Sequence, residues 1–338
     1  MSDINSRIAE LRAQMAKIGG GFGDRYSHED IYPEDIISFD NISFDAVPTA
    51  AGESAPAANC GSAAATPAVD PVFRTLDLYR PKASEASGGA GNGSAPAALP
   101  KLPVILSVHG GGWIMGEKDS YRPYCCTLAR EGFAVIAINY HLTPEAQFPV
   151  PLEDVNMAFT WVLAHADEYG LDTEHIFAVG DSAGAHLLSL YTCFLTNGQY
   201  TGRFSFRPPE GLKILALGLN CGQFDIRPEE RNDKDPAYEV MEAYLPGGAT
   251  DENLLSVCVT DHMTKNFPPC HLVSGTGDFL FPQQLVMEKA LAKRNIPFEF
   301  RFCSQGSRQL GHVFHLNVTK EVSREANRAQ CEFFKAFL

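Results

Sequence analysis

The feature that most constrains the fold is a regular alternation of short apolar runs with longer helical patterns, which begins at Pro103. The apolar runs lie at 103–108, 133–138, 175–179, 212–217 and 271–273. The helical patterns between them lie at 120–131, 152–169, 184–196 and 282–295. Strands that are apolar along their whole length are buried on both faces, and a parallel sheet covered by helices provides that environment. The alternation therefore predicts an α/β fold with a mostly parallel central sheet and helices on both faces.

Two further segments and one interruption complete this pattern. A strand-like run at 298–302 and a final helix at 318–337 follow, whereas residues 223–264 are rich in charge, proline and aromatic residues. A chain of 338 residues is ordinary for one α/β domain that carries a cap. We therefore expect residues 71–338 to form the main domain, with a cap insertion at about 223–264. Residues 1–70 are expected to supply an N-terminal cap helix, a leading strand and a low-complexity loop.

The N-terminal part of the chain has its own patterns. Apolar residues at helical spacing predict a helix over 4–18: Ile4, Ile8, Leu11, Met15 and Ile18. Few cations flank this stripe, so packing onto the protein is favoured over lying on a membrane surface. Two stretches, 50–69 and 83–99, consist almost entirely of Ala, Gly, Ser and Pro and predict surface loops. A strand-like run at 73–79 lies between them, so we expect both stretches to be insertions in hairpin connections.

Composition limits the partners and the compartment. The chain has 27 Lys and Arg against 41 Asp and Glu, a net charge of −14, and no basic cluster, which argues against nucleic acid as a partner. No apolar run approaches the roughly 18 residues of a membrane span, and the charged N-terminal segment lacks a signal peptide's apolar core. The nine cysteines are odd in number and contain no C-x-x-C pair. These features predict a cytoplasmic protein without a membrane span, and they leave a homodimer open.

The strongest local signal is the pentapeptide Gly-Asp-Ser-Ala-Gly at 180–184, between the apolar run that ends at Val179 and the helical run Ala185–Leu195. A G-x-S-x-G pentapeptide alone is weak, but a strand before it and a helix after it give it meaning. A sharp strand-to-helix turn needs glycines for steric room, and it holds the serine exposed in a strained conformation. This context favours Ser182 as a nucleophile over the alternative of a helix N-cap serine.

The second signal is the segment His109–Trp113, in which three consecutive glycines directly follow the apolar run 103–108. Glycines let backbone N–H groups approach a ligand closely. In acyl transfer such donors face the oxygen that becomes negative in the tetrahedral intermediate. A phosphate-binding loop would need a lysine after the glycines, and here Trp113 follows. We expect His109 to be structural and to hold the loop through hydrogen bonds.

A serine nucleophile needs a histidine base and an orienting carboxylate, which follow the serine in the chain in this type of sheet. Asp278 comes just after the apolar run 271–273, which places it at the carboxyl edge of the sheet. His312 comes after the strand-like run 298–302 and before the final helix. Their order and their positions at strand ends support one another, and His315 is the competing base.

These motifs resemble the hormone-sensitive-lipase branch of the α/β-hydrolase fold, which contains microbial carboxylesterases and acetyl esterases. The resemblance covers about residues 70–338. The motifs that carry it are His-Gly-Gly-Gly-Trp at 109–113, Gly-Asp-Ser-Ala-Gly at 180–184, Tyr-His-Leu-Thr-Pro-Glu at 140–145, Phe148-Pro149 and Leu152-Glu153-Asp154. The family usually has Arg at the position of His141 and Ala at that of Thr143, so the ion pairing of this loop is expected to differ.

The resemblance implies a catalytic role for three side chains and three backbone donors. Ser182 would be the nucleophile, Asp278 the acid and His312 the base. The oxyanion hole would take N–H groups from Gly111, Gly112 and Ala183. The other motif residues are expected to support the site: His109, Gly110, Trp113, Gly180, Asp181 and Gly184.

The resulting prediction is a serine carboxylesterase that hydrolyses small-molecule esters through an acyl-enzyme. A compact cap favours short acyl groups of roughly two to six carbons, such as acetyl. Hydroxycinnamoyl or acetylated-carbohydrate esters are the alternative substrates. No metal-spaced cluster of His, Cys, Asp or Glu is recognised, so no metal or cofactor is expected. The alternative of another class is a non-catalytic ligand-binding receptor on the same fold, and the presence of both Asp278 and His312 argues against it.

Overall fold

The central sheet has eight strands in the order β1-β2-β4-β3-β5-β6-β7-β8, in a computed structural model that describes residues 2–19, 32–45, 72–82, 99–231 and 236–338. The strands are β1 (Ile36–Ser43), β2 (Thr75–Pro81), β3 (Leu102–Val108), β4 (Ala134–Ile138), β5 (Leu171–Asp181), β6 (Ile214–Asn220), β7 (Cys270–Gly275) and β8 (Phe298–Cys303). β2 pairs antiparallel with both β1 and β4, and every other neighbouring pair is parallel. The predicted mostly parallel sheet is confirmed.

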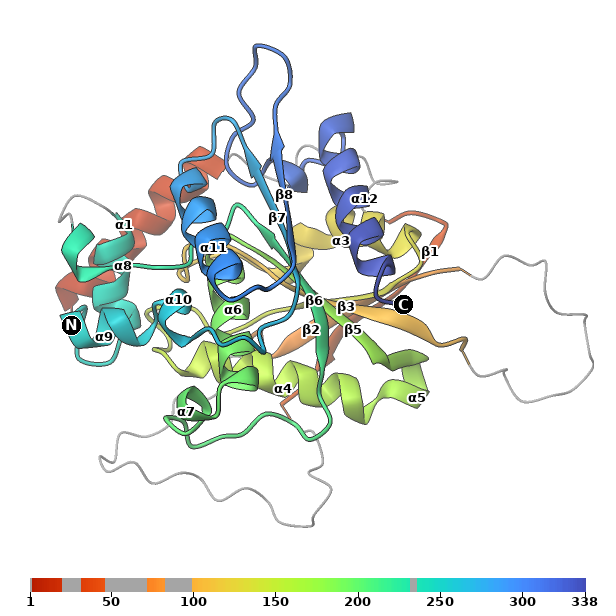
Figure 1. The fold of residues 1–338 in the computed structure, drawn as a ribbon, viewed down its shortest axis with the longest axis horizontal. Coiled ribbons are helices and arrows are strands. Elements are labelled where there is room, and N and C mark those ends of the chain that lie inside the picture. Colours follow the sequence, from red (N-terminus) through yellow and green to blue (C-terminus); the bar gives the residue numbers. More distant parts are fainter. Residues whose placement is uncertain (1, 20–31, 46–71, 83–98, 232–235) are drawn as a thin grey trace, which may run out of the picture.

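Helices cover this sheet on both sides (Figure 1). The α-helices are α1 (Ser2–Gly19), α3 (Arg122–Arg130), α4 (Val150–Ala164), α5 (Ala166–Tyr169), α6 (Ala183–Thr196), α7 (Gly198–Thr201), α8 (Pro236–Tyr244), α9 (Asp251–Ser256), α10 (Val259–His262), α11 (Phe281–Lys293) and α12 (Glu321–Lys335). Short 3₁₀ helices are η2 (Lys118–Tyr121), η3 (Pro228–Glu230) and η4 (Phe314–Leu316). Both predicted layers of helices are therefore present.

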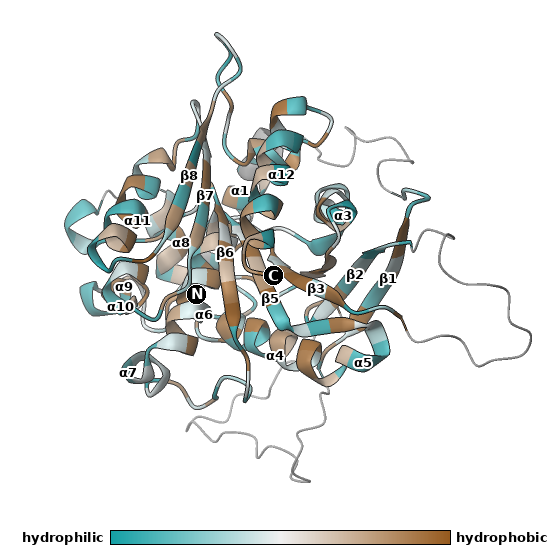
Figure 2. Ribbon diagram, turned by 45° about the vertical axis from the view of Figure 1, so that its right-hand side comes forward, coloured by the Kyte–Doolittle hydropathy of each residue, from teal (hydrophilic) through white to brown (hydrophobic). Residues whose placement is uncertain are grey.

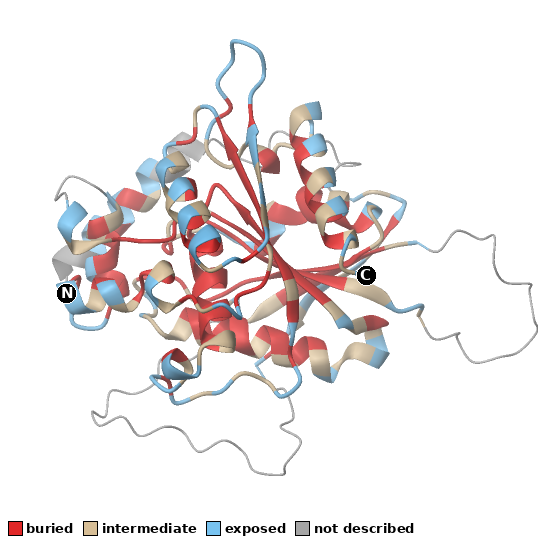
Figure 3. Ribbon diagram, viewed as in Figure 1, coloured by how far each residue is buried: buried red, intermediate tan, exposed pale blue. Residues whose placement is uncertain are grey.

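The core explains why the strands are apolar throughout. In β3, Ile105 packs in one cluster with residues of α3 and α12, whereas its neighbours Val104 and Leu106 pack in another cluster with residues of α4 and α6. Successive side chains of a strand point to opposite faces, so a sheet covered on both sides needs apolar residues at every position. Figures 2 and 3 show hydrophobic and buried residues concentrated along the central strands and on the inner sides of the helices.

Two of the predicted helices differ from the observed ones by an internal break or by a later start. The helical pattern 152–169 is divided at His165, where α4 ends and α5 begins. His165 has φ −109° and ψ 17°, which is outside the α-helical region, so its backbone interrupts the helix. The final helix begins at Glu321 rather than 318, because η4 and a turn occupy the residues before it.

The connections of β2 differ from one another. β1 and β2 are antiparallel neighbours, so the chain between them is a hairpin connection as predicted. The expectation of a second hairpin at 83–99 is wrong, because β4 lies between β2 and β3 in the sheet. This connection is a crossover past β4, which sequence periodicity could not reveal. The low-complexity residues 50–69 and 83–98 themselves lie outside the described residues.

The N-terminal helix packs beside the predicted insertion. α1 contacts α8, and the two lie side by side in Figure 1. Ile8 and Leu11 of α1 are buried in the same cluster as Tyr238 and Met241 of α8. Packing of the apolar stripe against the protein is therefore confirmed at these two described positions. No helix within the described ranges has the length and apolar character needed to cross a bilayer.

Candidate active site

Ser182 lies at a sharp turn between β5 and α6, as the strand-before and helix-after context predicted. Its φ of 52° and ψ of −120° are unusual for a residue with a side chain, which indicates a strained backbone. Gly184 lies so close to the carbonyl oxygens of Val108 and His109 that a Cβ there would collide with both. Ser182 occupies the N-cap position of α6, but its side chain makes no capping hydrogen bond. The N-cap interpretation is therefore not supported.

The glycine loop that follows β3 folds back on itself. Gly111 adopts φ +117°, a conformation that residues with side chains rarely adopt. Its carbonyl oxygen accepts hydrogen bonds from Ile114 N at 3.2 Å and Met115 N at 3.0 Å. The loop approaches the serine turn closely, since a Cβ placed on Gly110 would lie 3.2 Å from Ser182 Cβ. Two segments, whose residues Gly110 and Ser182 are 72 positions apart in the sequence, thus meet at the carboxyl edge of the sheet.

His109 is buried beside this loop. Its Nδ1 lies 2.7 Å from the carbonyl oxygen of Gly110, and its ring stacks on Tyr140 with centroids 4.3 Å apart. Tyr140 also donates its hydroxyl to the carbonyl of His109 at 3.0 Å. Burial lowers the pKa of His109 to about 4, which keeps the ring neutral near pH 7. These contacts can hold the loop but give His109 no exposed position from which to act as a base.

A tyrosine joins the two glycine motifs. Gly110 N donates to the hydroxyl of Tyr121 at 2.8 Å, and the same hydroxyl donates to Asp181 Oδ2 at 2.9 Å. Burial raises the pKa of Asp181 to about 7, although the hydrogen bond from Tyr121 opposes the rise. The sequence analysis missed Tyr121, because no motif links position 121 to either loop.

Asp278 and His312 form a hydrogen-bonded pair, with 2.7 Å between Asp278 Oδ1 and His312 Nδ1. Asp278 Oδ2 accepts the hydroxyl of Ser274 at 2.7 Å, and Oδ1 accepts Leu280 N at 3.0 Å. Burial opposes ionisation of Asp278, but hydrogen bonds from His312 and Ser274 outweigh it, so the pKa of the carboxyl is lowered. The structure therefore brings together the two residues that the chain order had singled out.

The competing histidine is in a different environment. His315 is fully buried, and neither of its ring nitrogens has a hydrogen-bond partner within the part of the chain that the structure describes. Its ring packs edge-on against Tyr124, with centroids 5.3 Å apart. Burial lowers the pKa of His315 to about 3, and the nearby His312 adds to this effect. A buried imidazole without a carboxylate partner is poorly suited to accept a proton.

The sequence analysis also missed Cys221, which lies near the Asp278–His312 pair. It follows β6 with φ 47°, is buried, and its Sγ lies within 4.8 Å of a ligand atom of both Asp278 and His312. These three residue types can bind metals. However, burial raises the pKa of the Cys221 thiol well above its usual range, and the other two residues already bind each other. We therefore assign no metal to this cluster.

The departure from the family pattern at His141 has a structural counterpart. Asp154 is fully buried, and its Oδ2 lies 2.8 Å from His141 Nδ1. Arg74 of the loop before β2 donates its Nε to the other oxygen, Oδ1, at 2.7 Å. A guanidinium from a different part of the chain thus pairs with this carboxylate, and Glu145 of the same motif pairs with Arg12 of α1.

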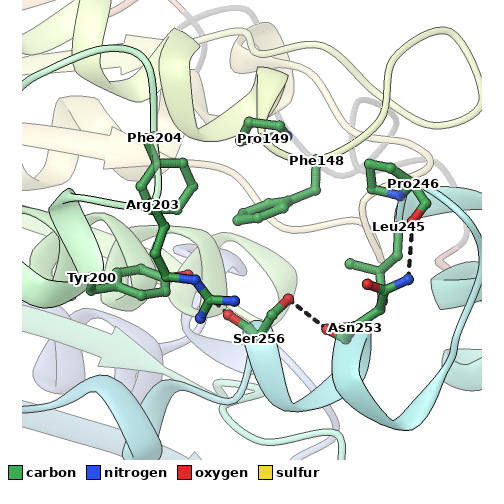
Figure 4. Close-up of a pocket in the computed structure, with 9 residues that line it drawn as sticks. All are labelled: Phe148, Pro149, Tyr200, Arg203, Phe204, Leu245, Pro246, Asn253 and Ser256. Carbon is green, nitrogen blue, oxygen red and sulfur yellow. Dashed lines mark hydrogen bonds between the residues drawn. The ribbon is translucent and has the colours of Figure 1, made fainter.

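A pocket of about 220 Å³ lies apart from these groups. Its lining residues are Phe148, Pro149, Tyr200, Arg203, Phe204, Leu245, Pro246, Asn253 and Ser256, which gather around it in Figure 4. None of them belongs to the glycine motifs or to the Asp278–His312 pair. A row of rings connects the pocket to the glycine loop, because Phe148 packs on Tyr244 and Tyr244 packs on Trp113, each with centroids 5.9 Å apart.

Comparison with curated proteins gives relatives of similar description. An acetyl esterase of Salmonella typhi is 30% identical over 205 residues, which cover 59% of this chain and 62% of the relative. A versiconal hemiacetal acetate esterase of Dothistroma septosporum is 28% identical over 215 residues, which cover 58% and 62%. A probable carboxylic ester hydrolase, LipM, of Mycobacterium tuberculosis is 30% identical over 186 residues, which cover 54% and 42%. The matched part therefore spans less than two thirds of the length of each of these relatives.

Solved structures and a family model identify the fold and the family. Esterase B from Lactobacillus rhamnosis superimposes with a TM-score of 0.78 at 23% identity, covering 99% of this chain and 96% of that protein. A bacterial heroin esterase gives a TM-score of 0.64 at 20% identity, covering 98% and 92%. The model of the BD-FAE family matches residues 95–290, more than half of the chain. This chain therefore has the α/β-hydrolase fold and belongs to the BD-FAE family.

Proposed function

We propose that this protein is a serine carboxylesterase that hydrolyses short-chain acyl esters. The observation that carries the proposal is the strained turn that presents Ser182 beside the glycine loop, with no capping hydrogen bond on its side chain. The Asp278–His312 pair supplies the base and its orienting acid in the order that the fold requires. The names of the curated relatives, an acetyl esterase and an acetate esterase among them, support the same reaction class.

The proposed mechanism has two steps. His312 takes the proton of the Ser182 hydroxyl as the oxygen attacks the ester carbonyl, and Asp278 stabilises the imidazolium. Backbone N–H groups of Gly111, Gly112 and Ala183 donate to the oxyanion. The tetrahedral intermediate then collapses, His312 protonates the leaving alcohol, and an acyl-enzyme remains. His312 then takes a proton from a water molecule as the water attacks this ester, and it returns the proton to the Ser182 oxygen as the carboxylic acid leaves.

The proposed preference for short acyl groups rests on the residues around Trp113. This ring directly follows the glycine loop and is buried against His186 of α6 and Tyr244 of α8, with centroids 5.1 and 5.9 Å apart. We expect these large rings, which lie near the proposed oxyanion donors, to limit the depth available to a long acyl chain. We expect the highest kcat/KM on esters whose acyl groups have roughly two to six carbons.

The test uses the full chain, its Ser182→Ala variant, and p-nitrophenyl esters from acetate to palmitate. The variant should retain less than about a thousandth of the wild-type kcat, because the nucleophile is lost from an already formed turn. A fluorophosphonate should label Ser182 in the wild type, which a non-catalytic receptor would not show. Activity of the variant within tenfold of the wild type would place the nucleophile elsewhere. A maximum on esters of twelve or more carbons would refute the short-acyl preference alone.

A further inference from the structure

Arg12 of the N-terminal helix reaches two segments that lie more than one hundred residues away in the sequence. Its Nε donates to the carbonyl of Ile114 at 2.6 Å, and its Nη2 donates to the carbonyl of Thr143, also at 2.6 Å. Glu145 accepts from Nη1 at 2.9 Å and from Nη2 at 2.6 Å. A planar guanidinium held by a bidentate carboxylate has a fixed orientation. Glu145 therefore aligns Arg12 toward the two carbonyls.

The residues that carry these two carbonyls also donate hydrogen bonds to the glycine loop. Ile114 closes the turn by donating its N–H to the carbonyl of Gly111. Thr143 donates its N–H to the carbonyl of Trp113 at 2.9 Å. Arg12 thus connects Ile114, at the end of the turn, to Thr143, which is itself hydrogen-bonded to Trp113. Arg12, Thr143 and the segment 113–114 therefore form a closed hydrogen-bond network next to Gly111 and Gly112.

The outer side of this turn borders a cavity, although the Ile114 side chain itself is buried in the core. A cavity of about 410 Å³ adjoins it and is lined by Arg12, Ile114, Met115 and Gly116, among other residues. Backbone next to open space can shift at less cost than backbone that is packed to the density of a protein core. The hydrogen bonds from Arg12 to Ile114 and Thr143 can therefore help to fix the position of the turn.

We propose that Arg12 is a positioning residue for the oxyanion donors Gly111 and Gly112, an inference that rests on the proposed esterase function. Arg12 bonds residues next to the loop, and within the described part of the chain none of its hydrogen bonds goes to Ser182, Asp278 or His312. Hydrogen-bond donors stabilise an oxyanion only when they are held in place before the reaction, and a misplacement of about 1 Å can cost about 100-fold in rate. Docking of α1 thereby contributes to catalysis as well as to the cap.

The test compares Arg12→Met with Arg7→Met. Arg7 lies on the same helix and pairs with Glu239 of α8 and with Glu10, and among the described residues it makes no ion pair with the glycine loop. Arg12→Met should lower kcat on a short p-nitrophenyl ester about tenfold, with KM changed less than about twofold. Arg7→Met should leave both constants within about twofold. Arg12→Lys should recover the activity only in part, because the three N–H groups of one ammonium cannot reach all four acceptor oxygens of Ile114, Thr143 and Glu145.

A second measurement does not depend on activity. Amide hydrogen exchange at Ile114 and Met115, whose N–H groups close the turn, should become faster in Arg12→Met and stay unchanged in Arg7→Met. Unchanged exchange and unchanged kcat in a folded Arg12→Met variant would overturn the inference. Equal effects of both variants would also overturn it, because they would show general loss of helix docking. A fully active Ser182→Ala variant would instead refute the proposed function, and the exchange data would remain a separate test of whether Arg12 holds the loop.

Discussion

Replacing Asp278 by Asn should separate the charge of the proposed acid from its orienting role. Oδ1 of Asp278 accepts hydrogen bonds from both His312 Nδ1 and Leu280 N, whereas Oδ2 accepts the hydroxyl of Ser274. The amide oxygen of Asn must occupy the Oδ1 position, because an NH₂ group there would face the N–H of Leu280. The NH₂ group can then donate to Ser274, whose hydroxyl also serves as an acceptor. His312 therefore keeps its proton on Nδ1 in this variant.

The expected loss follows from the missing charge. At roughly 4 Å and an effective dielectric constant of about 20, a carboxylate stabilises an imidazolium by about 4 kcal/mol. This corresponds to a fall in kcat of about three orders of magnitude. A triad in which the Asn substitution also imposes the wrong histidine tautomer loses about 10⁴-fold. We therefore expect Asp278→Asn to lose about 10³-fold.

The assay is kcat on a short p-nitrophenyl ester between pH 6 and 9, together with the ¹⁵N chemical shifts of His312. The shifts should still report a proton on Nδ1 in Asp278→Asn. Ser274→Ala is the matched control, because it removes a single hydrogen bond from Oδ2 and should cost less than about tenfold. A loss of less than tenfold in Asp278→Asn would show that Asp278 is not the acid. A proton on Nε2 instead of Nδ1 of His312 would refute the prediction that Leu280 N fixes the orientation of the Asn amide.

Three further predictions concern other titratable groups. His312→Ala should reduce kcat about as severely as loss of the nucleophile, whereas His315→Ala should leave kcat within about tenfold; the reverse pattern would move the base to His315. Burial, with a contribution from Arg301, lowers the pKa of His271 from 6.5 to about 4. As the pH falls, the unfolded chain therefore protonates His271 before the folded protein does. The free energy of unfolding should decrease as the pH falls from 6.5 to 4. His271→Gln should remove about 3 kcal/mol of that fall in urea titrations at the two pH values, and an unchanged pH dependence would contradict this. Burial raises the pKa of Asp181 from 3.8 to about 7, so the free energy of unfolding should decrease as the pH rises through this range. Asp181→Asn should make this decrease smaller. A variant with the same pH dependence as the wild type would show that Asp181 ionises with its usual pKa.

The sequence by itself determined the elements and their order. Runs such as 103–108 and 175–179 are apolar at every position because parallel strands under two helical layers are buried on both faces, and this is a local property of the chain. Strand ends also placed Ser182, Asp278 and His312 at one edge of the sheet, because carboxyl ends of parallel strands meet there. The sequence pattern did not determine the helix limits, because the break at His165 depends on the backbone angles of that one residue.

Only the tertiary structure decided which distant residues meet. The crossover from β2 to β3 depends on the insertion of β4 between them, and no local pattern encodes that neighbour. The same holds for Arg12 with Glu145, for Tyr121 between Gly110 and Asp181, and for Cys221 near the Asp278–His312 pair. Periodicity reports which side of an element is buried, because burial follows the repeat of the helix or strand. Periodicity does not show which residues of another element a side chain will contact, because those contacts depend on how whole helices and strands pack against one another.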